Sequence, residues 1–257
     1  MNSALLHNTI EVARTAGEII REHWRLPRDV QYKGRIDLVT KTDAAVEAHL
    51  KERLNTLLPG VGFMGEESAH SLIPGGDCWI VDPLDGTTNF VHGIPFVAVS
   101  IALWQDGATR LGIVTLPILD ECFYAERGHG AYCNGGALQV SKTVRCEQGL
   151  IATGFPYDID VQKNNILRWL GAVLPQCRGV RRCGAAAADL AYVAAGRYEA
   201  FYETGLKPWD MAAGWLLVEE AGGRVTNILG EALRFGDVIL ASNGHVHQEM
   251  VDLLNEK

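Results

Sequence analysis

Between residues 61 and 140 the sequence is a succession of strand-like segments separated by turn residues. In the segment 95–104, larger apolar residues occupy every second position and smaller residues lie between them: Val97, Val99, Ile101 and Leu103. A period of two is typical of a strand with two different faces. Because no helical period separates these strands, we expect a largely antiparallel sheet here.

Helical patterns lie on both sides of this region. Apolar residues recur at steps of three and four over residues 6–24, and a second helix is expected from Thr42 or Asp43 to residue 57. After residue 141, predicted strands at 149–155, 197–203, 222–227 and 238–243 alternate with predicted helices at 164–174, 185–195, 209–221 and 247–257. This predicts a mixed α+β and α/β chain in two parts, residues 1–140 and 141–257, which share a large interface.

The composition excludes several classes of protein. The 257 residues are 47% hydrophobic and 21% charged, which is ordinary for a globular protein, and the formal net charge of −8 disfavours nucleic acid and anionic membranes as partners. The start of the chain lacks a secretory pattern, and no run approaches ~18 apolar residues. Six scattered cysteines with no Cys-x-x-Cys pair indicate reduced thiols rather than a zinc site. We therefore expect a cytoplasmic location.

The stretch WIVDPLDGTTNF, residues 79–90, places two carboxylates directly after an apolar segment. Asp82 and Asp85 each have a plain explanation as turn formers. Together on one tight turn they repel each other unless a cation neutralises them, and Mg²⁺ prefers carboxylate and carbonyl oxygens. The carbonyl of Leu84 is a further candidate ligand. The backbone N–H groups that follow, from Gly86 to Thr88, begin a short helical turn and form a candidate anion site, although the threonines could equally be helix caps.

Other acidic residues have a structural explanation when taken singly. Glu66 and Glu67 could be solvated loop residues, Asp210 a favourable acid at a helix start, and Asp43 a helix cap. His245 and His247, at the start of the last helix, are expected at the surface. Core packing explains Cys78 and Cys183 as well as any functional role does.

The motifs in combination resemble the inositol monophosphatase family of Mg²⁺-dependent phosphatases. They run in order over essentially the whole chain: DLVTKTD at 37–43, GEES at 65–68, DPLDGTTNF at 82–90, GAAAADLAYVAAGRYEAFYE at 184–203 and WDMAAGWLLVEEAGG at 209–223. The resemblance implies a layered αβαβα sandwich, a homodimer, sensitivity to lithium, and two or three Mg²⁺ ions per active site. The continuation TTNF resembles the branch that acts on inositol phosphates.

The resemblance also implies roles for individual residues. The matching metal ligands are Glu66, Asp82, the Leu84 carbonyl, Asp85 and Asp210. Asp43, Glu67 and Thr87 match residues around the nucleophilic water and an additional metal. The substrate contacts comprise Leu84, Asp85, Gly86, Thr87, Arg181, Gly184, Ala185, Ala186, Glu203 and Asp210. Arg182 is adjacent to Arg181, and a shift of one residue would exchange them. Lys33 has an approximate counterpart on a loop.

These roles lead to a hypothesis of Mg²⁺-dependent hydrolysis of a sugar-alcohol phosphate, myo-inositol monophosphate above all, by a metal-activated water without a phosphoenzyme. The same chemistry on fructose 1,6-bisphosphate, a nucleotide 3′-phosphate or histidinol phosphate is an alternative. Another is a regulatory binding protein that retains the phosphatase fold, although the intact acidic set favours catalysis.

Overall fold

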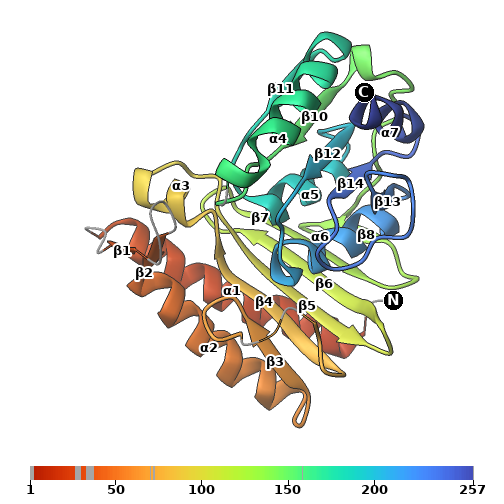
Figure 1. Cartoon of the computed structure of the whole chain (residues 1–257). Helices are drawn as coiled ribbons and strands as arrows, with labels where there is room; N and C mark the ends of the chain where they lie inside the picture. The colour runs from red at the N-terminus through yellow and green to blue at the C-terminus, as the bar shows by residue number, and fades with distance from the viewer. Residues whose placement is uncertain are drawn as a thin grey trace.

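The computed structural model describes residues 3–26, 30–32, 38–69, 71, 73–157 and 159–256. These residues form five layers in the order helices, sheet, helices, sheet, helices (Figure 1). Three separate apolar clusters fill the spaces between the layers. The architecture confirms the predicted αβαβα sandwich.

The first outer layer contains α1 (Ala4–Trp24) and α2 (Lys41–Leu57). It covers a seven-stranded sheet of order β3-β4-β5-β6-β7-β8-β9, with bounds β3 (Gly62–Gly65), β4 (Cys78–Asp85), β5 (Ala98–Gln105), β6 (Ala108–Leu116), β7 (Glu121–Glu126), β8 (Ala131–Cys133) and β9 (Gly136–Ala137). A hairpin of β1 (Val30–Tyr32) and β2 (Leu38–Thr40) precedes α2.

The central layer contains α5 (Ala186–Ala194) and α6 (Pro208–Glu220). Beyond it lies a five-stranded sheet of order β11-β10-β12-β14-β13, with bounds β10 (Leu150–Thr153), β11 (Gly179–Arg181), β12 (Ala200–Glu203), β13 (Arg224–Asn227) and β14 (Ile239–Ser242). The last layer contains α4 (Ile159–Val173) and α7 (His247–Asn255). Short 3₁₀ turns occur at η1 (Cys146–Gln148) and η2 (Leu174–Gln176).

The seven-stranded sheet is largely antiparallel, as predicted, with β3 and β4 as the parallel pair. The expectation that no helix interrupts residues 61–140 is wrong, because α3 (Thr87–His92) lies between β4 and β5. The short helical turn expected at Gly86 thus continues for six residues. Helix α4 starts at Ile159, five residues before the predicted start at residue 164.

The two faces of β5 explain why two helical layers can pack on one sheet. Its larger residues, such as Val99 and Ile101, face α1 and α2, whereas the smaller Ala98 and Ala102 face α6. Gly112 on β6 allows an even closer approach, since a Cβ there would lie 2.8 Å from the Ala213 carbonyl oxygen. Small residues on this face therefore bring α6 directly against the sheet.

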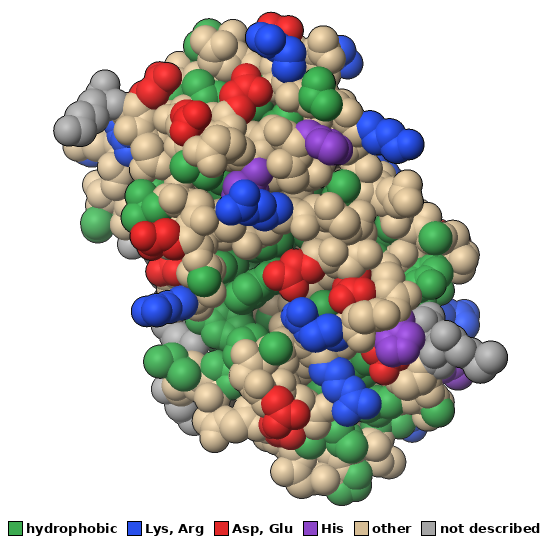
Figure 2. Space-filling model, turned by 90° about the vertical axis from the view of Figure 1, so that its right-hand side faces the viewer, with side chains coloured by type: hydrophobic (Ala, Val, Ile, Leu, Met, Phe, Trp, Pro, Cys, Tyr) green, Lys and Arg blue, Asp and Glu red, His purple; other side chains and the backbone are tan. Residues whose placement is uncertain are grey.

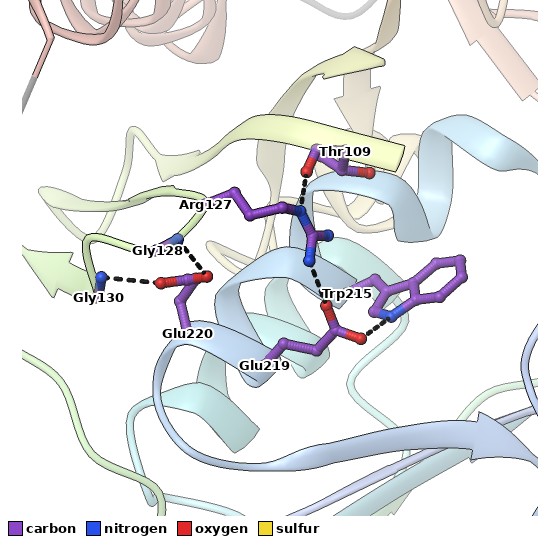
Figure 3. Close-up of polar contacts among 7 residues, drawn as sticks. All are labelled: Thr109, Arg127, Gly128, Gly130, Trp215, Glu219 and Glu220. Carbon is purple, nitrogen blue, oxygen red and sulfur yellow. Dashed lines mark hydrogen bonds and ion pairs between the residues drawn. The ribbon is translucent and has the colours of Figure 1, made fainter. Parts of the chain in front are cut away.

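Both ends of α6 are tied to the seven-stranded sheet. At its start, the Ser100 hydroxyl on β5 donates to the Trp209 carbonyl at 3.0 Å. At its end, Figure 3 shows two acidic anchors: Glu219 accepts from Arg127 and from the Trp215 indole, and Glu220 accepts backbone N–H groups in the turn after β7. These contacts fix the orientation of α6, which carries Asp210.

The prediction that His247 lies at the surface is wrong. His247 is 1% exposed, and its Nε2 and Nδ1 atoms hydrogen-bond with the Thr226 and Ser242 hydroxyls at 2.9 and 2.8 Å. A helix start usually faces solvent, but here the first turn of α7 packs against β13 and β14, which are paired with each other. His245 is exposed, as expected.

Residues 140 and 141 separate the strands of the two sheets, and the division into two domains at that point stays a prediction. None of the helices in the described ranges is long and apolar enough to span a membrane. On the face shown in Figure 2, acidic and basic side chains are interspersed.

Candidate active site

One cavity of about 310 Å³ opens where the seven-stranded sheet, the central helices and β12 meet. Most of the predicted site residues line it: Glu66, Asp82, Leu84, Asp85, Gly86, Thr87, Gly184, Ala185, Ala186, Glu203 and Asp210. They come from segments up to about 140 residues apart in the sequence. The fold therefore brings the motifs of both parts of the chain to one place.

A β-bulge at the end of β4 shapes the base of the cavity. Asp82 pairs with Ser100 and Asp85 pairs with Ala98, so Pro83 and Leu84 together lie opposite a single residue of β5. A bulge bends the strand and interrupts its hydrogen-bonded ladder, and Pro83 has no N–H to donate. The Asp82 Oδ1 atom accepts the Leu84 N–H at 2.9 Å, which fixes this turn.

Asp85 and Asp210 are both oriented by backbone groups at helix starts. Asp85 Oδ2 accepts the Ala187 N–H at 2.8 Å in the first turn of α5. Asp210 Oδ2 accepts the Lys207 N–H at 2.6 Å, just before α6. Asp210 thus has the place at a helix start that the sequence offered as its structural explanation, and it also lines the cavity. Each bond engages one carboxylate oxygen, so the other oxygen can serve a ligand.

Burial is the main influence on the carboxylates of the cavity, and repulsion between them adds to it. Burial raises the pKa of Asp82 well above its ordinary value, and the charges of Glu66, Asp85 and Asp210 raise it further. Burial likewise raises the pKa values of Asp85 and Asp210, against the opposing effect of their backbone hydrogen bonds. Buried carboxylates that repel one another form a site that favours either protons or cations.

The donors match a hard divalent cation, since they are carboxylate oxygens with the Leu84 carbonyl nearby. In the part of the chain that the structure describes, no three acidic, histidine or cysteine side chains already surround a common ion position. The match to a divalent cation therefore rests on the chemistry of the donor atoms and on the repulsion between the carboxylates. Glu66, Asp82, Leu84, Asp85 and Asp210 are the residues that would hold the ions.

Thr87 connects the cavity to a buried carboxylate behind it. Its hydroxyl lies 3.0 Å from Asp43 Oδ1 and 3.1 Å from the Leu84 carbonyl oxygen, both hydrogen-bond acceptors. Asp43 is fully buried, and its Oδ2 atom accepts from the backbone N–H and hydroxyl of Thr40. Thr40, rather than Thr42 or Asp43, is therefore the N-cap of α2, with Asp43 completing a capping box. Asp43 thus lies behind Thr87, which lines the cavity.

Gly86 is required by backbone conformation at the turn from β4 into α3. Its φ of +88° lies in the left-handed region, and a Cβ there would come within 3.1 Å of the Phe96 carbonyl and 3.2 Å of Ala185. The absence of a side chain at Gly86 thus allows this candidate phosphate-binding residue to approach the loop before α5.

Two predicted positions differ from the expected arrangement, and a third cannot be placed. Glu67 is not among the residues that line the cavity; its N–H donates to Glu47 at 2.9 Å. Arg182 lines the cavity and Arg181 does not, so the second of the two arginines between which the sequence left the choice open is the one at the cavity. Arg181 is exposed and donates to the Val180 carbonyl. Lys33 lies outside the described residues.

Sequence reasoning also missed part of the cavity wall. The loops after β10 and β12 contribute residues that carry no motif of their own: Gly154, Phe155, Pro156, Tyr157, Thr204, Gly205, Leu206 and Lys207. The signal that could have found them is their position, because each loop directly follows a strand of the second sheet.

The comparison with known families agrees with this site. The model of the inositol monophosphatase family matches residues 1–257, and the chain belongs to that family of metal-dependent phosphatases. It is therefore an enzyme of the phosphoric monoester hydrolase class.

Individual relatives cover nearly the whole chain. "Nus factor SuhB" of Pseudomonas aeruginosa is 44% identical, covering 91% of this chain and 90% of its own. "Inositol-1-monophosphatase" of Mesorhizobium japonicum is 42% identical, covering 89% and 87%.

Two solved structures show the same fold. The extragenic suppressor protein suhB of Bartonella henselae has a TM-score of 0.93 at 41% identity, with 99% of each chain covered. A structure of inositol monophosphate-bound SaIMPase-II has a TM-score of 0.82 at 28% identity, covering 97% of this chain and 93% of the other.

Proposed function

We propose that the chain catalyses Mg²⁺-dependent hydrolysis of myo-inositol monophosphate to myo-inositol and phosphate. The observation that carries this proposal is the convergence of four mutually repelling carboxylates and the Leu84 carbonyl on one cavity. The inositol monophosphate bound to SaIMPase-II supports this class of substrate.

The carboxylates divide into two sets of proposed ligands. Glu66, Asp82 and the Leu84 carbonyl would hold one ion, and Asp82, Asp85 and Asp210 a second, with Glu67 near a third. When bound, Mg²⁺ neutralises the phosphate charge and lowers the pKa of a water molecule. Asp82, placed in the bulge and 2% exposed, is common to both sets.

Other residues position the reactants. The Thr87 hydroxyl proton is directed to Asp43 or to the Leu84 carbonyl, so its oxygen lone pairs can accept a hydrogen bond from the attacking water. Glu66 provides a second acceptor for that water. The N–H groups of Gly86 and Thr87 donate hydrogen bonds to phosphate oxygens. Glu203 accepts hydrogen bonds from hydroxyl groups of the alcohol, which lies beside Gly184, Ala185 and Ala186. No side chain needs to form a covalent phosphoenzyme.

Phosphate release from a small panel of monoesters tests this function. The panel contains myo-inositol 1-phosphate, fructose 1,6-bisphosphate, a nucleotide 3′-phosphate and histidinol phosphate, each with Mg²⁺ and with excess chelator. We expect the highest kcat/KM on inositol 1-phosphate and none of this activity in chelator. Full activity in chelator would exclude the metal mechanism, and a preference for another ester would exclude the proposed substrate.

A second candidate function is favoured by the name of a relative. The Pseudomonas aeruginosa protein is called a Nus factor, which supports the alternative of a regulatory binding protein on the same fold. Capture of partners with the Asp82→Asn protein tests it: a partner retained by the inactive variant would show binding that does not depend on catalysis.

We further propose that the enzyme is a cytoplasmic homodimer that lithium inhibits. The family assignment supports these properties. Sedimentation analysis and inhibition of phosphate release by LiCl test them directly.

A further inference from the structure

Glu47, in α2, is a buried carboxylate to which the metal mechanism gives no role. It is 6% exposed and is not among the residues that line the cavity. Glutamate is rarely buried to this extent unless its carboxylate has a partner. Here the Glu47 Oε2 atom accepts the Glu67 N–H at 2.9 Å. The contact therefore joins α2 to the segment after β3 that also contains Glu66.

The end of β3 has the space that this carboxylate needs. A Cβ at Gly65 would lie 2.6 Å from the Glu47 Cδ atom and still closer to Oε2. Any other residue at this position would thus push the carboxylate or the strand away. The Gly65 carbonyl also accepts the Ala69 N–H at 2.8 Å, which closes a tight turn around Glu66 and Glu67. Gly65 and Glu47 are therefore matched to each other.

The backbone of Glu66 is held from two sides. Its own N–H donates to the Val81 carbonyl at 3.1 Å, one residue before Asp82. The next N–H along the chain, that of Glu67, donates to Glu47. Because the direction of a side chain follows from its backbone, these two bonds fix where the Glu66 carboxylate points. The placement of Glu66 relative to Asp82 thus depends on α2 as well as on the sheet.

The same face of α2 contacts the other turn that carries proposed ligands. Asp43 is fully buried, and its Oδ1 atom lies 3.0 Å from the Thr87 hydroxyl after β4. Asp43 and Glu47 are four residues apart, which places them on one face of the helix, about 6 Å from each other along its axis. One rigid helix therefore supports both turns, through Asp43 on one side and Glu47 on the other.

We propose that Glu47 is a positioning residue that holds Glu66 in place for metal binding by accepting the Glu67 N–H. The inference rests on the proposed Mg²⁺-dependent function, but Glu47 itself would not ligate an ion. What the site requires of Glu47 is an acceptor oxygen, not a further negative charge beside Glu66. Groups that orient a metal ligand in this way change metal affinity or activity by about 10- to 100-fold when they are removed.

Three variants of α2 test this role. Glu47→Leu removes the acceptor at similar size, whereas Glu47→Gln removes the charge but keeps an acceptor oxygen. Glu52→Leu is the matched control, because Glu52 lies on the same helix but is exposed. Titration calorimetry with MgCl₂ alone gives the Kd for Mg²⁺ without substrate. Phosphate release from inositol 1-phosphate gives kcat and KM, and thermal unfolding in chelator verifies that each variant is folded.

We expect Glu47→Leu to raise the Kd for Mg²⁺ about tenfold and to lower kcat about tenfold, with KM for the ester within about twofold. Glu47→Gln should stay within about threefold of the wild type in both quantities, because it can still accept the Glu67 N–H. Glu52→Leu should stay within about twofold. Rescue by glutamine distinguishes the hydrogen bond from the mere presence of a polar group that stabilises the fold.

Two results would overturn the role of Glu47. One is a Glu47→Leu protein with a lower melting temperature but an unchanged Kd for Mg²⁺, which would show a structural role alone. The other is an equal loss in Glu47→Gln and Glu47→Leu, which would show that the charge matters and not the acceptor.

A second route to the same contact decides the question if Glu47→Leu does not fold. Gly65→Ala leaves the Glu47 carboxylate in the chain but displaces it from the turn. It should raise the Kd for Mg²⁺ to a similar extent, and an unchanged Kd would reject the role of Glu47. A wild type that neither binds Mg²⁺ nor hydrolyses inositol 1-phosphate would instead reject the proposed function.

Discussion

The active-site cavity and the cluster around His247 both bury polar side chains, but in opposite states. Around His247, each ring nitrogen has a hydroxyl partner and the Gly244 N–H donates to Ser242. In the cavity, burial and neighbouring carboxylates raise the pKa values of Asp82 and Asp85. A satisfied buried network stabilises a fold, whereas unneutralised like charges cost stability and require a ligand. The difference separates a structural polar cluster from a functional one.

The largest effect should come from removing a cavity charge. We expect Asp82→Asn to lower phosphate release by about 10³-fold or more, because the residue common to both proposed ion sites becomes a neutral amide. The same change removes repulsion, so the melting temperature in chelator should equal or exceed that of the wild type. A variant with normal activity, or one that unfolds in chelator, would contradict this picture of the cavity.

A smaller loss should follow from Thr87→Val, which keeps the shape of the side chain but removes its hydroxyl. The bonds to Asp43 and to the Leu84 carbonyl are lost, and the attacking water loses one acceptor. We expect kcat to fall about 10²-fold with KM little changed. Thr9→Val is the control, since this buried hydroxyl donates to the Leu5 carbonyl within α1 and does not line the cavity, and the variant should behave like the wild type in the same steady-state assay.

The two regions should respond oppositely to pH. Burial lowers the pKa of His247 to about 4 from an unfolded value near 6.5, so its stability contribution is complete above 6.5 and is lost as pH falls toward 4. That contribution amounts to about 3 kcal/mol at most. The raised carboxylate pKa values of the cavity act in the other direction: without metal, they reduce stability as pH rises from about 4 through their folded values.

Urea unfolding at pH 7 and pH 5 of the wild type and His247→Gln measures the histidine part. The substitution should flatten the acid loss of stability while leaving activity at pH 7 within about twofold. An unchanged difference between the two pH values would show that other groups control acid stability.

The smallest effect should come from the partly exposed network of Figure 3. Arg127 donates to the Thr109 carbonyl and to Glu219, but its side chain is 45% exposed. Replacement by Met should cost about 1 kcal/mol or less, because exposed ion pairs contribute little. A larger loss in urea unfolding, or a loss of activity, would mean that the far end of α6 controls the position of Asp210.

The sequence was sufficient where chemistry is local. Asp82, Leu84 and Asp85 lie within one turn, so their position in one cavity could be predicted from short-range spacing and the family resemblance. It was insufficient where a role depends on tertiary contacts. Whether Arg181 or Arg182 faces the cavity depends on how β11 ends, since one residue reverses the direction of a side chain on a strand. The partners of His247 come from β13 and β14, which no local pattern indicates.

The bulge in β4 makes the active site depend on the number of residues as well as on their identity. Residues three apart on a regular strand point to opposite faces, but the bulge leaves Asp82 and Asp85 opposite Ser100 and Ala98, which share a face. Deletion of Pro83 would restore an uninterrupted ladder with β5 and so remove the bend on which the turn at Leu84 depends. Every proposed ligand would still be present in such a chain. Libraries that exchange side chains one at a time never sample this failure, so redesign of the enzyme must treat the length of this strand as fixed.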